Sequence, residues 1–150
     1  MVNTEIIGAT QLVFFNTGTT NTPVWTKVEG QRKGDLKRPM KTIESHTKDQ
    51  YPYEDYVYGY QGWAIDFDGV WVIDSVTGLQ APGIRYVQYC WENRVYPTVM
   101  LVGATPNDVP VLSYTGTVAL TAWDMPGPYD NLVTYTGTLQ GKGAYVFAGQ

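Results

Sequence analysis

The segment YTGTVALTAW (residues 114–123) and the segment LVTYTGTLQ (residues 132–140) both contain the tetrapeptide Tyr-Thr-Gly-Thr. Both segments also alternate apolar with polar residues, and a β-strand sends alternate side chains to opposite faces. The stretch between them, DMPGPYDN (residues 124–131), is rich in residues that favour turns. Together these features predict one long β-hairpin in the last third of the chain.

The predicted hairpin has an apolar face and a polar face. The apolar face consists of Tyr114, Val118, Leu120, Ala122, Val133, Tyr135 and Leu139. The polar face is almost free of charge and consists of Thr115, Thr117, Thr121, Thr134, Thr136, Thr138 and Gln140. Threonine favours strands in general, which is one explanation for this composition. The other explanation is a wall along which something large and charged slides without binding.

Length and composition indicate a single globular domain over residues 1–150. Hydrophobic residues make up 43% of the chain and charged residues 16%, which argues against disorder. The one cysteine, Cys90, excludes an internal disulfide. The N-terminal residues MVNTEII do not resemble a signal peptide, and no apolar run has the roughly 20 residues that a membrane span requires. We therefore expect a protein made in a cytoplasm, without a membrane partner.

The charge is distributed unevenly along the chain. Residues 1–48 contain seven basic and four acidic residues, whereas residues 49–150 contain three basic and ten acidic residues. Nucleic-acid binding depends on clustered Lys and Arg that displace counterions. The strand-rich part of the chain has the opposite charge and is expected to repel phosphate.

Further strands are predicted before the hairpin. We expect strands over residues 6–16, 24–29 and 41–48, with an N-terminal arm at about residues 1–5. In the segment 62–73, Trp63, Ile65 and Phe67 share one face, while Asp66 and Asp68 share the other with Ala64. Gly69 is expected to turn or bulge this strand.

A helix is predicted over residues 82–93, followed by a strand over 95–102 and a loop over 105–110. Pro82 suits a first helical turn. Ile84, Val87 and Trp91 form an apolar stripe that would face a sheet, with Cys90 beside it. The predicted fold is therefore mainly β, a β-sandwich or open barrel with one flanking helix.

Residues 30–60 are predicted to form a projecting arm. The stretches 30–40 and 49–60 lack hydrophobic periodicity, and long irregular segments in compact domains are usually functional or disordered. The tyrosines of the second stretch argue against disorder, and we expect a contact between subunits. The residues expected to make it are Arg32, Lys33, Lys37, Arg38, Tyr51, Tyr53, Tyr56 and Tyr58.

No pattern of residues predicts a catalytic, cofactor or metal site. His46 has no nucleophile motif around it, and Cys90 is expected to be a small core residue. Asp66 and Asp68 begin like a calcium loop, but Thr77 stands where the bidentate Glu is needed. Residues 137–143 miss the phosphate-loop spacing, and no pair of carboxylates suggests a glycosidase. The five tryptophans and the tyrosines of 51–60 leave one alternative open, a carbohydrate-binding β-sandwich.

The chain resembles the major tail protein, the tail tube subunit, of bacteriophages with long non-contractile tails. The resemblance rests on residues 43–72, in particular Thr47-Lys48-Asp49 and Gly62-Trp63-Ala64-Ile65-Asp66-Phe67-Asp68-Gly69. It also rests on Tyr114–Thr121 and on Pro128–Tyr135 continuing to Gln140-Gly141-Lys142-Gly143. The inner-tube proteins of contractile tails and of type VI secretion systems remain an alternative within the same architecture.

The resemblance implies a β-sandwich with a flanking helix and a structural role in the virion tail, without catalysis or a cofactor. Subunits of the family form stacked rings, generally hexameric, and their strands join into an inner β-barrel through which DNA passes into the host without specific binding. A long loop reaches a neighbouring subunit or ring, and the tape measure, terminator and distal tail proteins are further partners. The lumen would then be lined by Asp66, Asp68, Thr115, Thr117, Thr121, Thr134, Thr136, Thr138 and Gln140.

Overall fold

The computed structural model describes residues 11–45, 48–50, 52–53, 55–73, 75–104, 110–127 and 132–149. The predicted N-terminal arm, His46, Tyr51, most of the 105–110 loop and residues 128–131 of the hairpin turn lie outside the described residues. In chain order the elements are β1 (Leu12–Asn16), β2 (Trp25–Lys27), β3 (Gln31–Lys37), β4 (Met40–Ser45), a 3-10 turn (Lys48–Gln50), β5 (Asp55–Gln61), β6 (Ala64–Val70), α1 (Pro82–Asn93), β7 (Thr98–Ala104), β8 (Pro110–Asp124), β9 (Thr134–Gly141) and β10 (Val146–Gly149).

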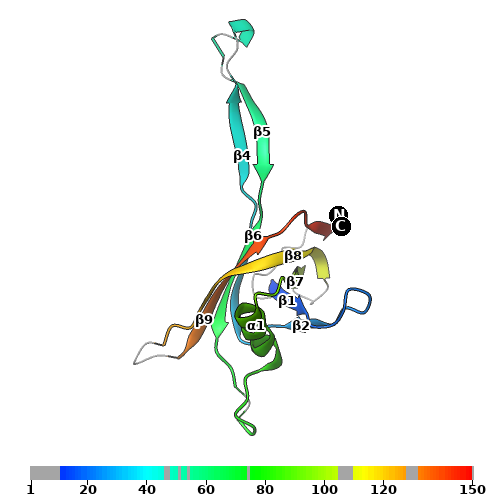
Figure 1. Cartoon of the computed structure of the whole chain (residues 1–150), viewed down its shortest axis with the longest axis vertical. Coiled ribbons are helices and arrows are strands. Elements are labelled where there is room, and N and C mark those ends of the chain that lie inside the picture. Colours follow the sequence, from blue (N-terminus) through cyan, green and yellow to red (C-terminus); the bar gives the residue numbers. More distant parts are fainter. Residues whose placement is uncertain are drawn as a thin grey trace, which may run out of the picture.

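Eight strands form one antiparallel sheet, in the order β2-β1-β7-β8-β9-β6-β3, with β10 paired to β8 (Figure 1). The long strand β8 belongs to both halves of this sheet. Its first part pairs with β7 and β10, and from Val118 onward it pairs with β9. The sheet therefore folds over at β8 into two layers, β2-β1-β7-β8-β10 and β8-β9-β6-β3. The predicted mainly β fold with one flanking α-helix is confirmed.

The hydrophobic core lies between the two layers. Val13, Phe15, Val99 and Leu101 contribute from one layer, and the other contributes the alternate residues of β6 and β9. The latter are Ile65, Phe67, Tyr135 and Leu139, all at most 1% exposed. The alternation predicted for Trp63 to Asp68 and for residues 134–140 is confirmed. Val133, predicted for the apolar face, lies before β9 and is 42% exposed.

Trp63 packs at one end of the core, against glycines of β8 and β9. A Cβ atom on Gly116 would lie 2.6 Å from its ring, and one on Gly141 would lie 2.2 Å from it. The indole Nε1 donates a hydrogen bond to the Gly143 carbonyl at 2.8 Å, and Tyr145 meets the ring edge-on. The glycine of each Tyr-Thr-Gly-Thr repeat has a related role, because Gly137 leaves room for Phe67 as Gly116 does for Trp63.

Helix α1 covers one side of the core, and it begins and ends where the sequence predicts. Ile84, Val87 and Cys90 are its buried residues, whereas Trp91 is 40% exposed. The predicted stripe through Trp91 is therefore wrong at its last position. The carboxylate of Glu29, just after β2, accepts hydrogen bonds from the Gly83 and Ile84 N–H groups, at 3.0 and 3.4 Å. A carboxylate placed there satisfies otherwise unpaired donors of the first helical turn.

Two stretches predicted to be irregular are strands. Residues 31–37 form β3, an edge strand of the main sheet, and residues 55–61 form β5. Of the described part of the predicted arm, β4 and β5 project from the body as a separate two-stranded hairpin, with the 3-10 turn Lys48–Gln50 between them (Figure 1). Gly69 lies inside β6 rather than at a turn, and a Cβ atom there would meet the Gly30 carbonyl at 2.3 Å. Residues 31–37 were predicted to be irregular because most of them are charged or polar. Gly34 and Leu36 nevertheless alternate with the charged residues, which is a short amphipathic strand pattern.

The side chain of Gln31 joins β3 to β1 across the otherwise open side of the fold. Its Oε1 accepts a hydrogen bond from the Val13 N–H at 2.9 Å, and its Nε2 donates to the Val13 carbonyl at 2.8 Å and to the Val28 carbonyl at 2.9 Å. Val13 and Val28 are both fully buried. The amide thus takes the place of a strand partner for main-chain groups that would otherwise be unpaired.

Replacement of this amide is expected to destabilise the fold. Gln31→Leu keeps a similar volume but leaves three buried main-chain groups unpaired, and each such group costs about 1–3 kcal/mol. We expect the free energy of unfolding, measured by urea denaturation, to fall by about 3 kcal/mol or more. The control Gln61→Leu, on the exposed hairpin, is expected to change it by less than about 0.5 kcal/mol. Equal effects of the two substitutions would contradict the role of Gln31.

Candidate assembly surfaces

The outer surface of the β3-β6-β9-β8 layer is a polar face that points away from the core. Directly paired residues of antiparallel strands lie on the same side of a sheet. The register sets two rows across all four strands, Lys33–Asp68–Thr136–Asp124 and Lys37–Ala64–Gln140–Ala119. With the residues between these rows, the polar face consists of Lys33, Asp35, Lys37, Ala64, Asp66, Asp68, Val70, Ala119, Ala122, Asp124, Thr134, Thr136, Thr138 and Gln140.

The structure brings together only part of the predicted lumen set. Asp66, Asp68, Thr134, Thr136, Thr138 and Gln140 share the polar face. Thr115 and Thr117 do not lie among them, because the first part of β8 belongs to the other layer, where they pair with Met100 and Thr98. The two rows of hydroxyls predicted to face each other are therefore separated by the fold of the sheet at β8.

A β-bulge at Thr121 changes the alternation of β8. Leu120 pairs with Leu139 and Ala122 pairs with Thr138, so that Thr121 is an extra residue between them. Its hydroxyl donates a hydrogen bond to the Thr138 carbonyl at 3.3 Å. The prediction that Ala122 shares the apolar face is wrong, because the extra residue turns Ala122 to the polar face and Trp123 towards the core.

Basic and acidic side chains are paired on the polar face. Lys37 Nζ lies 2.5 Å from Asp66 Oδ2, Lys33 Nζ lies 3.3 Å from Asp35 Oδ2, and Arg32 Nε lies 4.0 Å from Asp68 Oδ1. Arg32, the extra residue of the bulge between Gln31 and Lys33, joins the polar face through its pair with Asp68. With Asp124 and Arg32 included, the face carries one carboxylate more than it carries cations. These positions correct the predicted arm, since Arg32, Lys33 and Lys37 lie on β3 in the body.

The pairing of Lys37 with Asp66 shifts the pKa values of both side chains. The hydrogen bond and the charge of Asp66 raise the pKa of Lys37 above its ordinary value. The pKa of Asp66 is lowered, first by the hydrogen bond from Lys37, against the opposing effect of partial burial, and further by a hydrogen bond from the Thr138 hydroxyl. Both shifts favour the charged forms, so the pair stays ionised at neutral pH.

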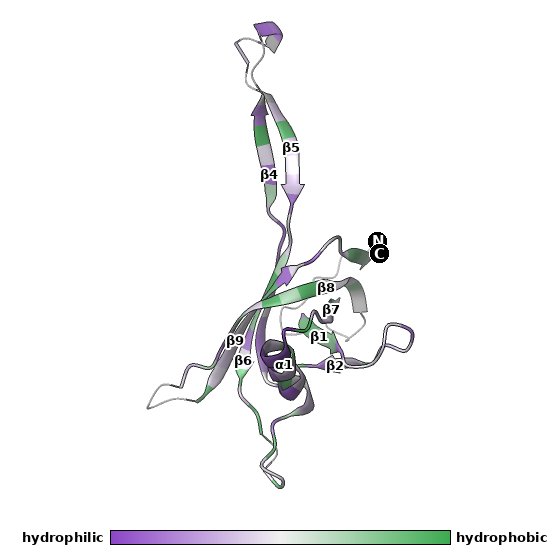
Figure 2. Ribbon diagram, in the orientation of Figure 1, coloured by the Kyte–Doolittle hydropathy of each residue, from purple (hydrophilic) through white to green (hydrophobic). Residues whose placement is uncertain are grey.

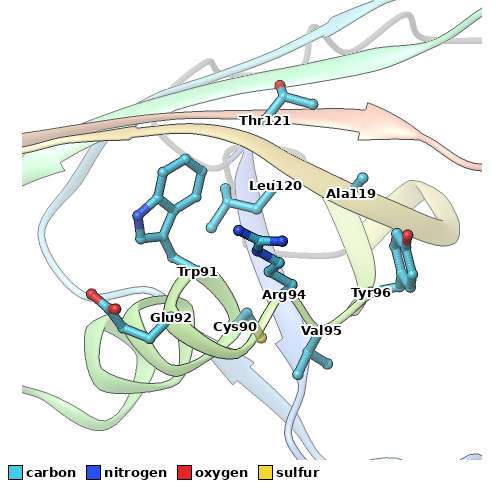
Figure 3. A pocket seen from close by; sticks show the side chains of 9 residues that line it. All are labelled: Cys90, Trp91, Glu92, Arg94, Val95, Tyr96, Ala119, Leu120 and Thr121. Carbon is cyan, nitrogen blue, oxygen red and sulfur yellow. The ribbon is translucent and has the colours of Figure 1, made fainter.

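The same layer has two open edges. Among the strands that the structure describes, β3 pairs only with β6, and residues 119–124 of β8 pair only with β9. One carbonyl of β3, that of Gly34, already accepts a hydrogen bond from the Gln11 side-chain Nε2 at 2.6 Å. A groove of about 510 Å³ runs beside this part of β8 (Figure 3). Trp91 and Arg94 point into it from the end of α1, and Leu120 points into it from β8, while Thr121 points away. Open edges present unpaired N–H and C=O groups to another strand.

The β4–β5 hairpin exposes large apolar and aromatic side chains on both faces. Figure 2 shows hydrophobic residues along its two strands. Tyr56 and Tyr58 lie on one face with their cross-strand partners, and Ile43 and Val57 lie on the other. Each is more than half exposed, and Tyr58 and the neighbouring Tyr60 reach 80% and 86%. Tyr53, beyond β5 at the tip, is also 80% exposed. Contiguous apolar surface of this kind marks an interaction site.

Arg38, also predicted for the arm, interacts with the body instead. Its guanidinium lies 5.3 Å from the centre of the Tyr114 ring, in a cation–π contact. Hydrogen bonds to Tyr145 and Tyr114 contribute to a raised pKa of Arg38. Arg38 therefore fixes the base of the β4–β5 hairpin to the body.

A chemical site is not evident in the described part of the chain. It holds no group of three or more His, Cys, Asp or Glu residues placed to bind a metal ion. Burial raises the pKa of the Cys90 thiol, in keeping with the predicted core position. Residues 137–141 of the near phosphate loop are strand β9. Within the described ranges, no helix has the length and apolar character to cross a membrane.

Comparison with protein-family models gives a match over residues 6–147, to the family described as phage tail tube protein. This chain belongs to the phage tail tube protein family. The predicted family is therefore confirmed, and as a tail tube protein it is a structural component of the virion tail. No curated protein matches the chain in sequence.

Solved structures share the fold of this tail tube protein at low sequence identity. The tail of an empty gene transfer agent particle, with C6 symmetry, has 15% identity and a TM-score of 0.75, over 95% of this chain and 98% of that chain. The SPP1 tail tube has 11% identity and a TM-score of 0.74, over 97% and 80%. A sheath/tube terminator of an extracellular contractile injection system has 13% identity and a TM-score of 0.66, over 99% and 100%. The fold is thus shared with tail and tail tube structures and with a contractile injection system.

Several residues of these surfaces were not predicted. Asp35 and Asp124 complete the charges of the polar face of the tail tube protein, and Gln31 and Glu29 fix β3 and α1. The alternation Lys33-Gly34-Asp35-Leu36-Lys37 is the signal in the sequence that could have revealed β3 and its outward-facing charges. The contact of Gln31 with Val13 and that of Glu29 with Gly83 have no local signal, because these partners are 18 and 54 residues away.

The Lys37–Asp66 pair predicts a measurable change on substitution. Lys37→Met removes the main cause of the lowered pKa of Asp66, which is expected to rise in an NMR titration of the side-chain carboxyl. Lys48→Met, in the turn beyond β4, is the control and is expected to leave this pKa unchanged. An unchanged pKa of Asp66 in Lys37→Met would show that the two groups are not paired in solution.

Proposed function

We propose that this tail tube protein forms stacked hexameric rings and that the polar face lines a central channel that conducts DNA into the host cell. The family match and the C6 symmetry of a tail with the same fold support rings of six. The observation that carries the proposal is the pair of open edges, β3 and the end of β8, at the two sides of one polar layer.

Strand directions allow this layer to continue from one copy to the next. Each of the pairs β8·β9, β9·β6 and β6·β3 is antiparallel, so β3 and β8 run in opposite directions. When copies are related by rotation about a ring axis, β8 of one copy meets β3 of its neighbour, again antiparallel. Closing the ring in this way satisfies both open edges and leaves a barrel without edges.

The thickness of the second layer favours the polar face as the inner surface. Four strands from each of six copies, about 4.8 Å apart, give a barrel of about 115 Å circumference and about 18 Å radius, which strand tilt widens. A second sheet adds about 10 Å and a helix a further 10 Å or so. These layers would fill the barrel if they lay inside, so they belong outside, and the polar face then points inward.

The composition of the polar face suits the passage of DNA. Duplex DNA carries about one negative charge per 1.7 Å, and Lys or Arg side chains free to neutralise phosphates would hold it. The polar face carries threonine, alanine and paired charges, with one carboxylate in excess. The DNA would meet a wall that it neither binds nor strongly avoids.

The β4–β5 hairpin supplies contacts between rings. A two-stranded hairpin has marginal stability alone in water, and this one exposes apolar residues on both faces. It projects from the end of the body opposite the segment between β6 and α1 (Figure 1). Burial against a second copy in the next ring would stabilise it. At the ends of the tube, the partners would be the tape measure, terminator and distal tail proteins.

Cysteine pairs test the joint between neighbouring copies. Lys33 and Asp124 stand in one row across the layer, and Lys37 and Ala119 stand in the other. The four combinations of Lys33→Cys or Lys37→Cys with Ala119→Cys or Asp124→Cys therefore sample a joint in register or staggered by about four residues either way. Cys90 is buried, 1% exposed, and is not expected to interfere.

We expect at least one combination to form intermolecular disulfides in assembled tubes, because facing residues of paired strands have Cβ atoms about 4.5–5.5 Å apart. Non-reducing electrophoresis should show a ladder that stops at six subunits. The single-cysteine variants are the controls and should give no ladder. Tubes that form normally and show no ladder in any of the four combinations would rule out the β3–β8 joint, and a ladder that stops elsewhere would correct the ring number.

Removal of the β4–β5 hairpin separates ring formation from stacking. The Gly62 N–H donates a hydrogen bond to the Pro39 carbonyl at 3.1 Å, so replacing residues 40–61 with Asn-Gly can close the chain with a short turn. We expect the body to fold and the cysteine ladder to persist, while electron microscopy shows rings but no long tubes. Tubes of ordinary length would contradict the role of the hairpin.

A further inference from the structure

We propose that Asp35, Asp66 and Asp68 act as fixed counter-ions that prevent Lys33, Lys37 and Arg32 from binding DNA phosphates. The inference rests on the proposed function, in which the polar face lines the channel. It changes the role predicted for Asp66 and Asp68 from making the channel negative to neutralising individual cations of the same face.

The geometry of the pairs carries this inference. The ion pairs Lys37–Asp66, Lys33–Asp35 and Arg32–Asp68 span 2.5, 3.3 and 4.0 Å. In the two pairs with β6, the carboxylate side chain is 24% or 29% exposed, whereas the basic side chain is 63% or 58% exposed. The short aspartates are thus held in the sheet, and the longer basic side chains extend over them.

The register shows why the aspartates and cations depend on each other. Asp35 and Asp66 are direct cross-strand partners, and like charges in that position are destabilising. The cations reduce this repulsion, since Lys33 pairs with Asp35 and Lys37 pairs with Asp66. Asp35 and Asp66 therefore each have a local reason to keep a cation, independent of DNA, and Asp68 stands directly opposite Lys33.

The position of β3 explains why cations are present in a DNA channel at all. Edge strands are protected from wrong pairing by charged side chains, especially lysine. Before assembly β3 is such an edge. Lys33 and Lys37 then keep free subunits apart, and after ring closure the same side chains face DNA. The neighbouring carboxylates allow one strand to meet both requirements.

Particles built with Asp66→Asn/Asp68→Asn test the inference. The substitutions keep the side-chain shape but free Lys37 and Arg32, so that cations outnumber carboxylates on the face. We expect slower DNA release, followed by the fluorescence of a DNA-binding dye after the particles are triggered to open. With two freed cations, the contribution of each subunit to DNA binding should weaken about tenfold between 50 and 200 mM salt, and the difference from the unmodified particle should shrink accordingly.

The quadruple variant Asp66→Asn/Asp68→Asn/Arg32→Gln/Lys37→Gln is the matched control, because it removes the freed cations as well. It is expected to release DNA at the rate of the unmodified particle. Unchanged release in the double variant at every salt concentration would overturn the inference. Slow release that persists in the quadruple variant, or that does not depend on salt, would overturn it too, since lost packing rather than freed charge would then be the cause.

Electron cryomicroscopy of the same particles distinguishes this inference from the proposed function. A polar face on the outside of the tube would refute the proposed channel lining, and the inference with it. A polar face on the inside, together with normal DNA release by the double variant, would refute the counter-ion role alone.

Discussion

The main-chain N–H and C=O groups at the edges of the β3-β6-β9-β8 layer need hydrogen-bond partners, and the subunit is built around this need. Inside the subunit, the open side near β1 is satisfied by an amide side chain, Gln31, rather than by a strand. Along the outer edge of β3 and the end of β8, no described strand supplies partners. A sheet left open at both sides of one layer is suited to continue into copies of itself.

The remaining elements hold this layer in place. The long strand β8 links the two layers, and the bulge at Thr121 lets it keep Leu120 and Trp123 towards the core while Ala122 joins the polar face. Glu29 connects α1 to the layer, since its carboxylate caps the helix and its carbonyl accepts a hydrogen bond from the buried Tyr135 hydroxyl at 2.8 Å. Glu29 therefore connects the start of the helix to β9 of the polar layer through two hydrogen bonds.

The polar face and the β4–β5 hairpin differ in the kind of contact that their side chains favour. The polar face has small side chains and paired charges, whereas the β4–β5 hairpin has exposed tyrosine and aliphatic residues. Apolar surface gains free energy from burial, and paired charges on a polar face gain little from further contact. The apolar surface of the hairpin suits a lasting contact between proteins. The polar face suits the wall of a channel through which a polyanion moves.

The helix over 82–93 and the alternation of β6 and β9 could be predicted from the sequence, because a helix or strand imposes its period on nearby residues. The family could be predicted from the combination of several short segments. The sequence also predicted a projecting segment, although not that the segment is a hairpin that begins after β3. Only the tertiary structure placed Thr115 and Thr117 apart from Thr136 and Thr138, since the fold of the sheet at β8 separates residues that look equivalent along the chain. The sequence also did not predict the ion pairs between β3 and β6 or the contacts of Gln31 and Glu29. The partners in these contacts become neighbours only when strands distant in the sequence pair.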